Sequence, residues 1–301
     1  MFNSIEYATA FQNELDKAML AESCTGWMEG NAGMIKYLGG ADVKIPSLVL
    51  QGLADYDRDK GYTQGALTLS WQLAQMTQDR GRSFNLDAND VDESNFVLSA
   101  GNVMSEFQRT RVVPEVDAYR IAKLVKEAGE ENSRKYTVNA TSILKELKSD
   151  ITAVRDKIGD TEPLVCLMSI PVNAVLDSSD KLSKSFEVMN FEGGAAYTQV
   201  KALDGVPILR VPSSRMYSAI TMTADGDGGY TKAESAVSVN WIICAKSAPI
   251  AVSKTDTVRI FPPEQYPLAN AWHVDYRKYH DLWLPTNKKT SVLVNLAENS
   301  D

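Results

Sequence analysis

The chain has 301 residues, of which 44% are hydrophobic, and it carries 31 Lys and Arg against 39 Asp and Glu, a formal net charge of −8. This apolar content is ample for one large domain or two modest ones. An acidic chain is a poor candidate for gripping nucleic-acid phosphates, which require clustered Lys and Arg. The cysteines Cys24, Cys166 and Cys244 are far apart and form no C-x-x-C pair, which indicates buried thiols in a reducing compartment.

The first residues show neither the basic start nor the apolar stretch of a signal peptide, and no run of about 18 apolar residues follows, so we expect no membrane contact. Residues 3–20 have helical spacing and predict an amphipathic helix at a chain end. Its apolar stripe is Ile5, Ala8, Phe11, Leu15 and Met19. A helix docked on its own subunit and an arm that reaches a neighbouring subunit are both compatible with this pattern.

Residues 23–41 are rich in glycine and predict an irregular connection. Residues 43–50 and 66–73 then alternate like strands, with a charged turn region at 55–60 between them. This pattern predicts a long projecting hairpin. A lone hairpin is marginal in water, so we expect it to rest on a partner. Asp79, Arg80 and Arg82 surround Gly81, and we predict a turn there.

The pattern becomes helical from Asp92 to Gly129, with Pro114 expected to kink or split the helix and Gly129 to end it. Residues 138–158 form the clearest amphipathic helix of the sequence. Later segments are strand-like, at 163–169, 196–201, 206–211, 236–245, 256–261, 271–284 and 291–296. Helices that come early and strands that come late favour the α+β class.

Catalytic motifs are missing from the sequence. The only histidines are His273 and His280, and no nucleophile elbow, phosphate loop or zinc-protease motif appears. We therefore expect no enzyme activity, no catalytic residue and no cofactor. One segment, from Thr223 to Glu234, partly matches a calcium loop. Its candidate ligands are Asp225, Asp227 and Glu234, but Thr223 stands where an Asp ligand is expected, so a glycine-rich loop between two strands is the main interpretation.

Densely mixed charge between Asp55 and Arg120 suits a surface that meets another copy of the protein. The predicted subunit-contact residues are Asp55, Asp57, Arg58, Asp59, Lys60, Asp79, Arg80, Arg82, Glu115 and Asp117. Exposed ion pairs are worth only about 0–1 kcal/mol each, so such pairs would set the register between copies. A merely solvated charged face is the alternative.

These residues resemble a known family, the major capsid proteins of tailed bacteriophages with the Hong Kong 97 fold, in a subgroup of phages and prophages of Gram-positive hosts. The resemblance rests on five blocks: 55–58, 79–84, 90–93, 114–120 and 276–282. It implies an N-terminal arm at 1–41, an extended E-loop hairpin with flanking strands at 42–90, and the spine helix of a peripheral domain at 91–135. It also implies an axial domain at 136–250 and late strands at 251–301 that complete the peripheral and axial domains.

The resemblance implies a structural protein that self-assembles, as hundreds of copies in pentamers and hexamers, into an icosahedral shell around phage double-stranded DNA. The implied partners are a separate scaffolding protein, a portal protein and packaged DNA without sequence-specific contact. The implied location is the virion capsid, assembled in the host bacterial cytoplasm. An encapsulin-like compartment shell and a calcium-binding surface module are the alternatives.

Overall fold

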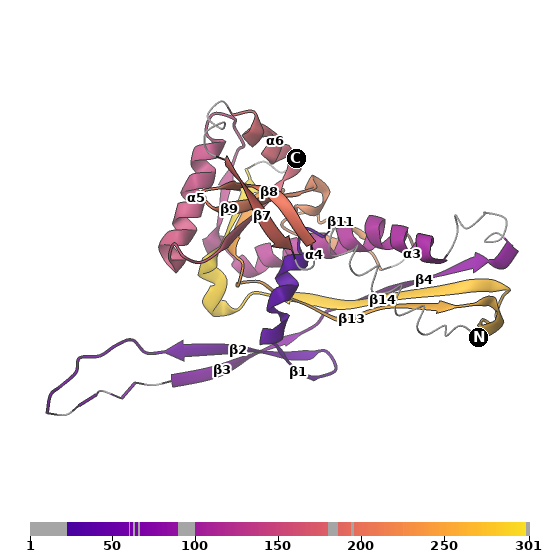
Figure 1. The fold of residues 1–301 in the computed structure, drawn as a ribbon, viewed down its shortest axis with the longest axis horizontal. Helices are drawn as coiled ribbons and strands as arrows, with labels where there is room; N and C mark the ends of the chain where they lie inside the picture. Colours follow the sequence, from indigo (N-terminus) through magenta and orange to yellow (C-terminus); the bar gives the residue numbers. More distant parts are fainter. Residues whose placement is uncertain are drawn as a thin grey trace.

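The computed structural model describes residues 23–59, 61–62, 64–65, 67–89, 100–179, 186–193, 196–224 and 226–298. They form a mixed helix and sheet body from which two long features extend in opposite directions (Figure 1). One feature is a two-stranded projection, and the other is a long sheet with a helix lying along it. Within the described residues, no helix is both long and apolar enough to cross a membrane.

The body is built on a seven-stranded sheet in the order β5-β15-β12-β6-β9-β8-β7. Its strands are β5 (Ser133–Tyr136), β6 (Leu164–Ser169), β7 (Phe186–Gly193), β8 (Ala196–Leu203), β9 (Val206–Val211), β12 (Val239–Ala245) and β15 (Val292–Ala297). Central β6 and β12 are buried at every position. Their nearly continuous apolar sequences are typical of strands covered on both faces.

Two helices pack on this sheet, α5 (Ile143–Ile158) and α6 (Ile170–Asp177). Leu147 and Ile151 of α5 are buried in the main core. The helix ends at Gly159, whose φ of 93° suits glycine. The Gly159 N–H donates to the Arg155 carbonyl at 2.7 Å and satisfies one of the last free carbonyls of the helix.

The second sheet is long and three-stranded, with β14 between β13 and β4. Its antiparallel strands are β4 (Gln78–Asp87), β13 (Ile250–Phe261) and β14 (Ala271–Trp283). Phe84, Val258 and Val274 pack in one apolar cluster with residues of the long helix. Because side chains alternate along a strand, Thr257 and Arg277 point to the other face.

The long helix consists of α3 (Ala100–Phe107), a π-helical segment (Gln108–Val112) and α4 (Val113–Ala128). Pro114 lies in the first turn of α4 and has no N–H to donate to the preceding turn. The helix widens just before it, where the Val113 N–H reaches the Gln108 carbonyl. The helix ends at Gly129, as predicted, with φ 77°. Residues 92–99 of the predicted helix lie outside the described residues.

The third sheet has the order β1-β2-β3 and includes the projecting hairpin. Its strands are β1 (Lys36–Gly39), β2 (Asp42–Leu50) and β3 (Leu67–Gln75). A small pair is formed by β10 (Ile220–Met222) and β11 (Tyr230–Lys232). The 3-10 segments are Gly26–Met34, Glu130–Asn132, Ser213–Arg215, Pro263–Gln265 and Thr286–Ser291.

Two sequence-based predictions of local structure were wrong. The segment around Gly81 is not a turn, because residues 78–87 form β4, paired along its length with β14. Helix α5 begins at Ile143 rather than near 138, because the Asn139 side chain accepts the Thr141 N–H at 2.9 Å and holds a turn first. Helix α6 and strand β7 were not anticipated. The predicted helix at 3–20 lies outside the described residues.

Candidate assembly surface

The base of the hairpin is anchored on the body by one of its two faces. Val43 and Ile45, two positions apart on β2, are 0% and 3% exposed. They share an apolar cluster with Ile250, Val252 and Trp283 at the ends of β13 and β14. Side chains two positions apart lie on the same face of a strand, so this contact fixes which face of the hairpin meets the body.

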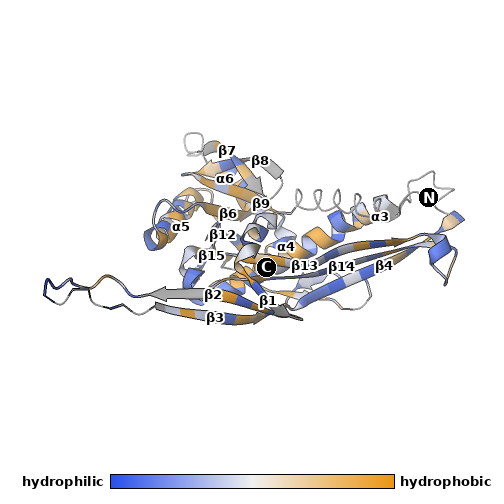
Figure 2. Ribbon diagram, turned by 60° about the horizontal axis from the view of Figure 1, so that its bottom comes forward, coloured by the Kyte–Doolittle hydropathy of each residue, from blue (hydrophilic) through white to orange (hydrophobic). Residues whose placement is uncertain are grey.

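The opposite face of the hairpin is apolar and exposed. Leu69, Trp71 and Leu73 alternate along β3 and are 54%, 37% and 73% exposed. Pro46 of β2 lies opposite Trp71 and is also exposed. The hairpin projects from the body in both views, with a hydrophilic tip and hydrophobic residues interspersed along β3 (Figure 2). Contiguous exposed apolar residues of this kind mark interaction surfaces.

The tip of the hairpin carries one half of the predicted contact residues. Asp55, Asp57, Arg58 and Asp59 lie here and are exposed, while Lys60 lies outside the described residues. The Gly61 N–H donates to the Asp57 carbonyl at 2.8 Å, and the Asp59 N–H donates to the Asp57 carboxylate at 2.8 Å. Gly61 has φ 78°, a backbone conformation that favours glycine. The tip is therefore a folded turn, and its role in subunit contact stays a prediction.

The remaining predicted residues lie on β4 and α4, away from the hairpin tip, and most form an ion pair within the chain. Asp79 pairs with Arg277 at 2.6 Å on the exposed face of the long sheet. The hydrogen bond from Arg277 holds the pKa of Asp79 below its ordinary value. Arg80 Nε lies 2.5 Å from a carboxylate oxygen of Glu115 on α4.

The candidate calcium loop is a connection between β10 and β11, as the main interpretation of the sequence predicts. The Arg80 guanidinium donates to the Thr223 carbonyl at 3.0 Å and to the Gly229 carbonyl at 3.3 Å. Arg82 donates to the Gly226 carbonyl at 2.8 Å. The two guanidinium groups that bind these carbonyls would repel a divalent cation in the loop.

Two of the three carboxylates proposed for calcium lie within the described residues. Asp227 and Glu234 are exposed, and Asp225 lies outside the described residues. Across the part of the chain that the structure describes, no group of three His, Cys, Asp or Glu side chains is arranged to hold a metal. The loop therefore acts, in this structure, as an acceptor for β4 arginines.

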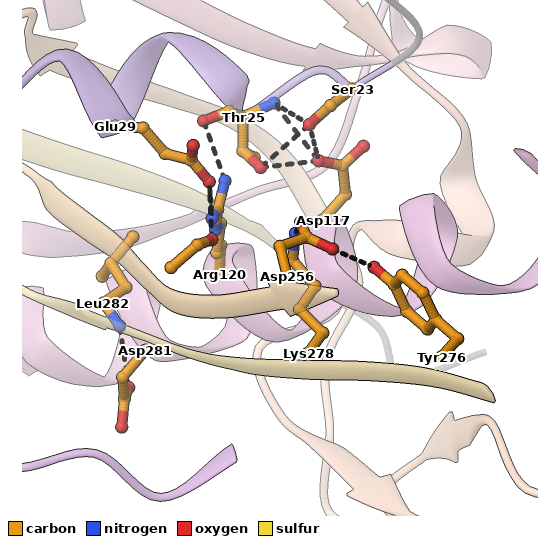
Figure 3. A network of polar contacts seen from close by, with 11 residues as sticks. Ser23, Thr25, Glu29, Asp117, Arg120, Asp256, Tyr276, Lys278, Asp281 and Leu282 are labelled. Carbon is orange, nitrogen blue, oxygen red and sulfur yellow. Dashed lines mark hydrogen bonds and ion pairs between the residues drawn. The ribbon is translucent and has the colours of Figure 1, made fainter. Parts of the chain in front are cut away.

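The prediction that Asp117 is a subunit-contact residue was wrong. Asp117 is fully buried and cannot contact another subunit directly. Its carboxylate accepts hydrogen bonds from the Ser23 hydroxyl at 2.7 Å and from the Thr25 hydroxyl at 2.5 Å. Arg215 of the body adds an ion pair at 3.0 Å. Figure 3 shows Ser23 and Thr25 directed at Asp117 from the segment that leads into the 3-10 helix at 26–34. Asp117 thus joins that segment, helix α4 and the body.

One turn further along α4, Arg120 makes a second buried connection. It is 1% exposed and forms an ion pair with Glu29 of the 3-10 helix (Figure 3). Ser253 of β13 also donates to Glu29, at 3.1 Å. Burial acts to raise the pKa of Glu29, but the charges of Arg120 and Lys278 outweigh it, so this pKa lies below its ordinary value.

Asp281 of β14 gathers a third group at the base of the hairpin. It is 0% exposed and accepts hydrogen bonds from the Thr77 N–H, the Tyr119 hydroxyl and the Lys123 ammonium, each at 2.8 Å. Burial would lower the pKa of Lys123, but its hydrogen bond to Asp281 raises it above the ordinary value. Because Thr77 connects β3 to β4, this cluster fixes the direction in which the hairpin leaves the body.

A fourth group lies on the helix-facing side of the long sheet. Lys278 is 3% exposed and pairs with Asp256, which also accepts from the Tyr276 hydroxyl at 2.7 Å (Figure 3). The neighbouring His280 is 2% exposed. Burial, followed by nearby cations including Arg120, holds the pKa of His280 well below its ordinary value. His280 is therefore a neutral core residue at pH 7.

None of the three cysteine thiols is activated as a nucleophile. Burial raises the pKa of Cys24 and of Cys244 to about 12 and raises the pKa of Cys166 as well. A thiol of this kind stays protonated and inert.

Sequence reasoning missed the buried roles of Arg120, Glu29 and Asp281. A signal was present for Arg120, since Asp117 and Arg120 are charged residues three positions apart in an otherwise apolar stretch of helix. Charged residues are almost never fully buried unless paired. Their partners, however, lie some 90 residues or more away in sequence, so no local pattern identifies them.

Comparison of the sequence with protein families and with curated proteins finds no match. Solved structures are similar in fold. The capsid structure of Cyanophage P-SCSP1u matches with a TM-score of 0.59 at 13% identity, covering 88% of this chain and 86% of that chain. The mature capsid of bacteriophage PhiM1 matches with a TM-score of 0.58 at 11% identity, covering 86% and 83%. A structure from Mycobacterium phage Che8 matches with a TM-score of 0.57 at 16% identity, covering 89% and 86%.

These similarities extend over most of the chain and show that it has the fold of tailed-phage capsid proteins. The prediction of an α+β capsid fold is confirmed. The low identities mean that the resemblance is carried by the arrangement of helices and strands.

Proposed function

We propose that this protein is a major capsid subunit, which assembles with many copies of itself into a closed icosahedral shell around phage double-stranded DNA. The proposal is carried by a capsid fold that spans 88% of the chain in the cyanophage comparison. It is supported by a hairpin face on which the apolar side chains of Leu69, Trp71 and Leu73 are exposed. In a closed symmetric shell, many modest contacts of this kind add up.

The proposed division of the chain follows the resemblance. Residues 1–41 are an arm and 42–90 the E-loop with its flanking strands. Residues 91–135 are the spine helix, 136–250 the axial domain, and 251–301 the late strands that complete both domains. We assign β4 to the peripheral domain, because it pairs with β14 beneath the long helix.

The hairpin would supply affinity and register through different residues. Leu69, Trp71 and Leu73 would bury apolar area against a neighbouring copy, at roughly 25 cal/mol for each Å² removed from water. The charged tip, with Asp57, Arg58 and Asp59, would select the position of the hairpin on that neighbour. The buried network beneath the hairpin would hold the same geometry in each copy.

The proposed partners are other copies in pentamers and hexamers, a scaffolding protein, a portal protein and packaged DNA. The net charge of −8 fits DNA that is enclosed without sequence-specific contact, since tight phosphate binding needs clustered cations. The proposed location is the virion capsid, assembled in the host cytoplasm. No enzyme activity is proposed.

Sedimentation velocity of the purified protein tests the assembly directly. The proposal predicts a fast boundary from particles of hundreds of copies, which disappears when Leu69 and Leu73 are replaced by serine. The slow boundary of a single folded chain must remain in that variant. A wild-type protein that stays monomeric under all conditions, including co-expression with a scaffolding protein, would contradict the proposal.

A further inference from the structure

A crevice of about 500 Å³ lies where α4 begins, between β4, β14 and the loop at 223–229. Its apolar wall contains Phe84, Phe107, Val112 and Val116. The rings of Phe84 and Phe107 meet edge to face with centroids 4.9 Å apart, and both residues remain partly exposed. The crevice therefore offers an aromatic floor that an apolar side chain can cover.

Several charged residues line the crevice, and Asp79, Arg80, Glu115 and Lys278 among them form ion pairs within the chain. The two arginines that remain, Arg82 and Arg111, outnumber the one remaining carboxylate, that of the exposed Asp227. Arg82 and Arg111 line it and are exposed. The hydrogen bond of Arg82 goes to a carbonyl rather than to a carboxylate, and Arg111 has no ion pair with any residue of the described ranges. Arg80, in contrast, is matched by Glu115. An occupant with acidic side chains fits this rim.

The described chain begins beside this crevice. Ser23 lines a small depression together with Val113, Val116 and Lys278. Val116 and Lys278 also line the crevice itself. The hydrogen bond from Ser23 to Asp117 fixes the chain at this point. The residues that precede Ser23 therefore start from the end of the crevice.

The segment 1–22 contains both the apolar and the acidic residues that would complement the crevice. Its apolar stripe is Ile5, Ala8, Phe11, Leu15 and Met19. It also contains four acidic residues, Glu6, Glu14, Asp16 and Glu22, and one basic residue, Lys17. As a helix, such a segment would be roughly 30 Å long, which exceeds the length of the helix from residue 107 to residue 116, roughly 15 Å.

We propose that residues 1–22 dock in this crevice of their own chain, with the apolar stripe on Phe84 and Phe107 and the acidic side chains toward Arg82 and Arg111. The proposal concerns the single subunit and holds whether or not the chain assembles into a shell. It assigns the segment to its own subunit rather than to a neighbour.

Hydrogen–deuterium exchange of the full-length monomer, followed by mass spectrometry, tests the docking. The wild type should show protection of residues 3–20 that does not change on dilution. The double variant R82E/R111E should raise exchange in that segment about tenfold, because attraction becomes repulsion on the rim. Adding E14K/D16K to that variant should restore protection.

The matched control is R109E/R259E, which reverses two exposed arginines that do not line the crevice and should leave exchange in 3–20 unchanged. Phe11→Asp, which alters only the segment, should release it as R82E/R111E does. Exchange at the unfolded rate in the wild type, or equal protection in R82E/R111E, would overturn the proposal. Protection that is lost on dilution would place the segment on a second copy and would also overturn it.

Discussion

Replacing Asp117 by asparagine removes one buried charge with almost no change of shape. The carboxylate is 0% exposed and receives hydrogen bonds from Ser23 and Thr25 and an ion pair from Arg215 at 3.0 Å. Asparagine has one acceptor oxygen, and its NH₂ group would face donors. The substitution therefore leaves Arg215, which is mostly buried, without a counter-charge.

The expected loss is large. Removing one partner of a buried, hydrogen-bonded ion pair costs about 3–5 kcal/mol. Asp79→Asn is the matched control, because Asp79 pairs with Arg277 at 2.6 Å, but both side chains are largely exposed. An exposed pair is worth about 0–1 kcal/mol. The structure thus predicts a clear separation between two Asp→Asn variants that each break one ion pair.

Urea denaturation of the monomer, followed by tryptophan fluorescence, measures the difference. The signal is the sum over five tryptophans, among them Trp27, which is 4% exposed and lies in the 3-10 helix that Asp117 holds in place. A free energy of unfolding for D117N within about 1 kcal/mol of that for D79N would contradict this prediction, because breaking the buried ion pair would then cost no more than breaking the exposed one.

Further predictions concern the hairpin, the long sheet and the response to acid. L69S/L73S should leave the free energy of unfolding of the monomer within about 0.5 kcal/mol of wild type while abolishing particles in electron micrographs; unchanged particles would contradict the role of this face. Gly81→Ala should destabilise the fold by about 1–3 kcal/mol, since the added Cβ would lie 2.7 Å from the Tyr276 carbonyl oxygen; thermal unfolding unchanged by the methyl group would show that the strands separate freely. Because burial holds the pKa of His280 well below its ordinary value of 6.5 in the folded chain, protons bind the unfolded chain preferentially. This residue therefore lowers stability as pH falls below 6.5, by about 1.4 kcal/mol at pH 5.5. Urea denaturation at several pH values should show this loss in the wild type and not in H280Q; equal pH dependence in both would contradict it.

Local periodicity predicted the parts of the fold that depend on neighbouring residues. The hairpin of β2 and β3 follows from two alternating runs with a glycine-bounded turn between them, and the long helix follows from a helical stripe that ends at Gly129. The π-helical segment before Pro114 is the local distortion expected from a missing N–H. In these cases the backbone preference and the apolar pattern agree.

The rest depends on pairing between distant segments. The sequence around Gly81 has two arginines and a glycine, which locally indicate a turn, but pairing with β14 makes it a strand. Glycine is needed there because a side chain would meet the partner backbone. The sequence alone indicates an exposed charge at Asp117, because its partners Ser23 and Arg215 come close to it only in the folded chain. The contact role of the hairpin tip depends on a second copy and stays a prediction.

Electron microscopy of the purified protein, expressed with and without its neighbouring genes, is the direct test of capsid assembly. A capsid subunit should give closed shells tens of nanometres wide, and particles from infected cells should contain nuclease-protected double-stranded DNA. Shells that enclose protein cargo and no DNA would contradict the capsid function while leaving assembly intact. Dispersed single chains under both conditions would contradict assembly itself.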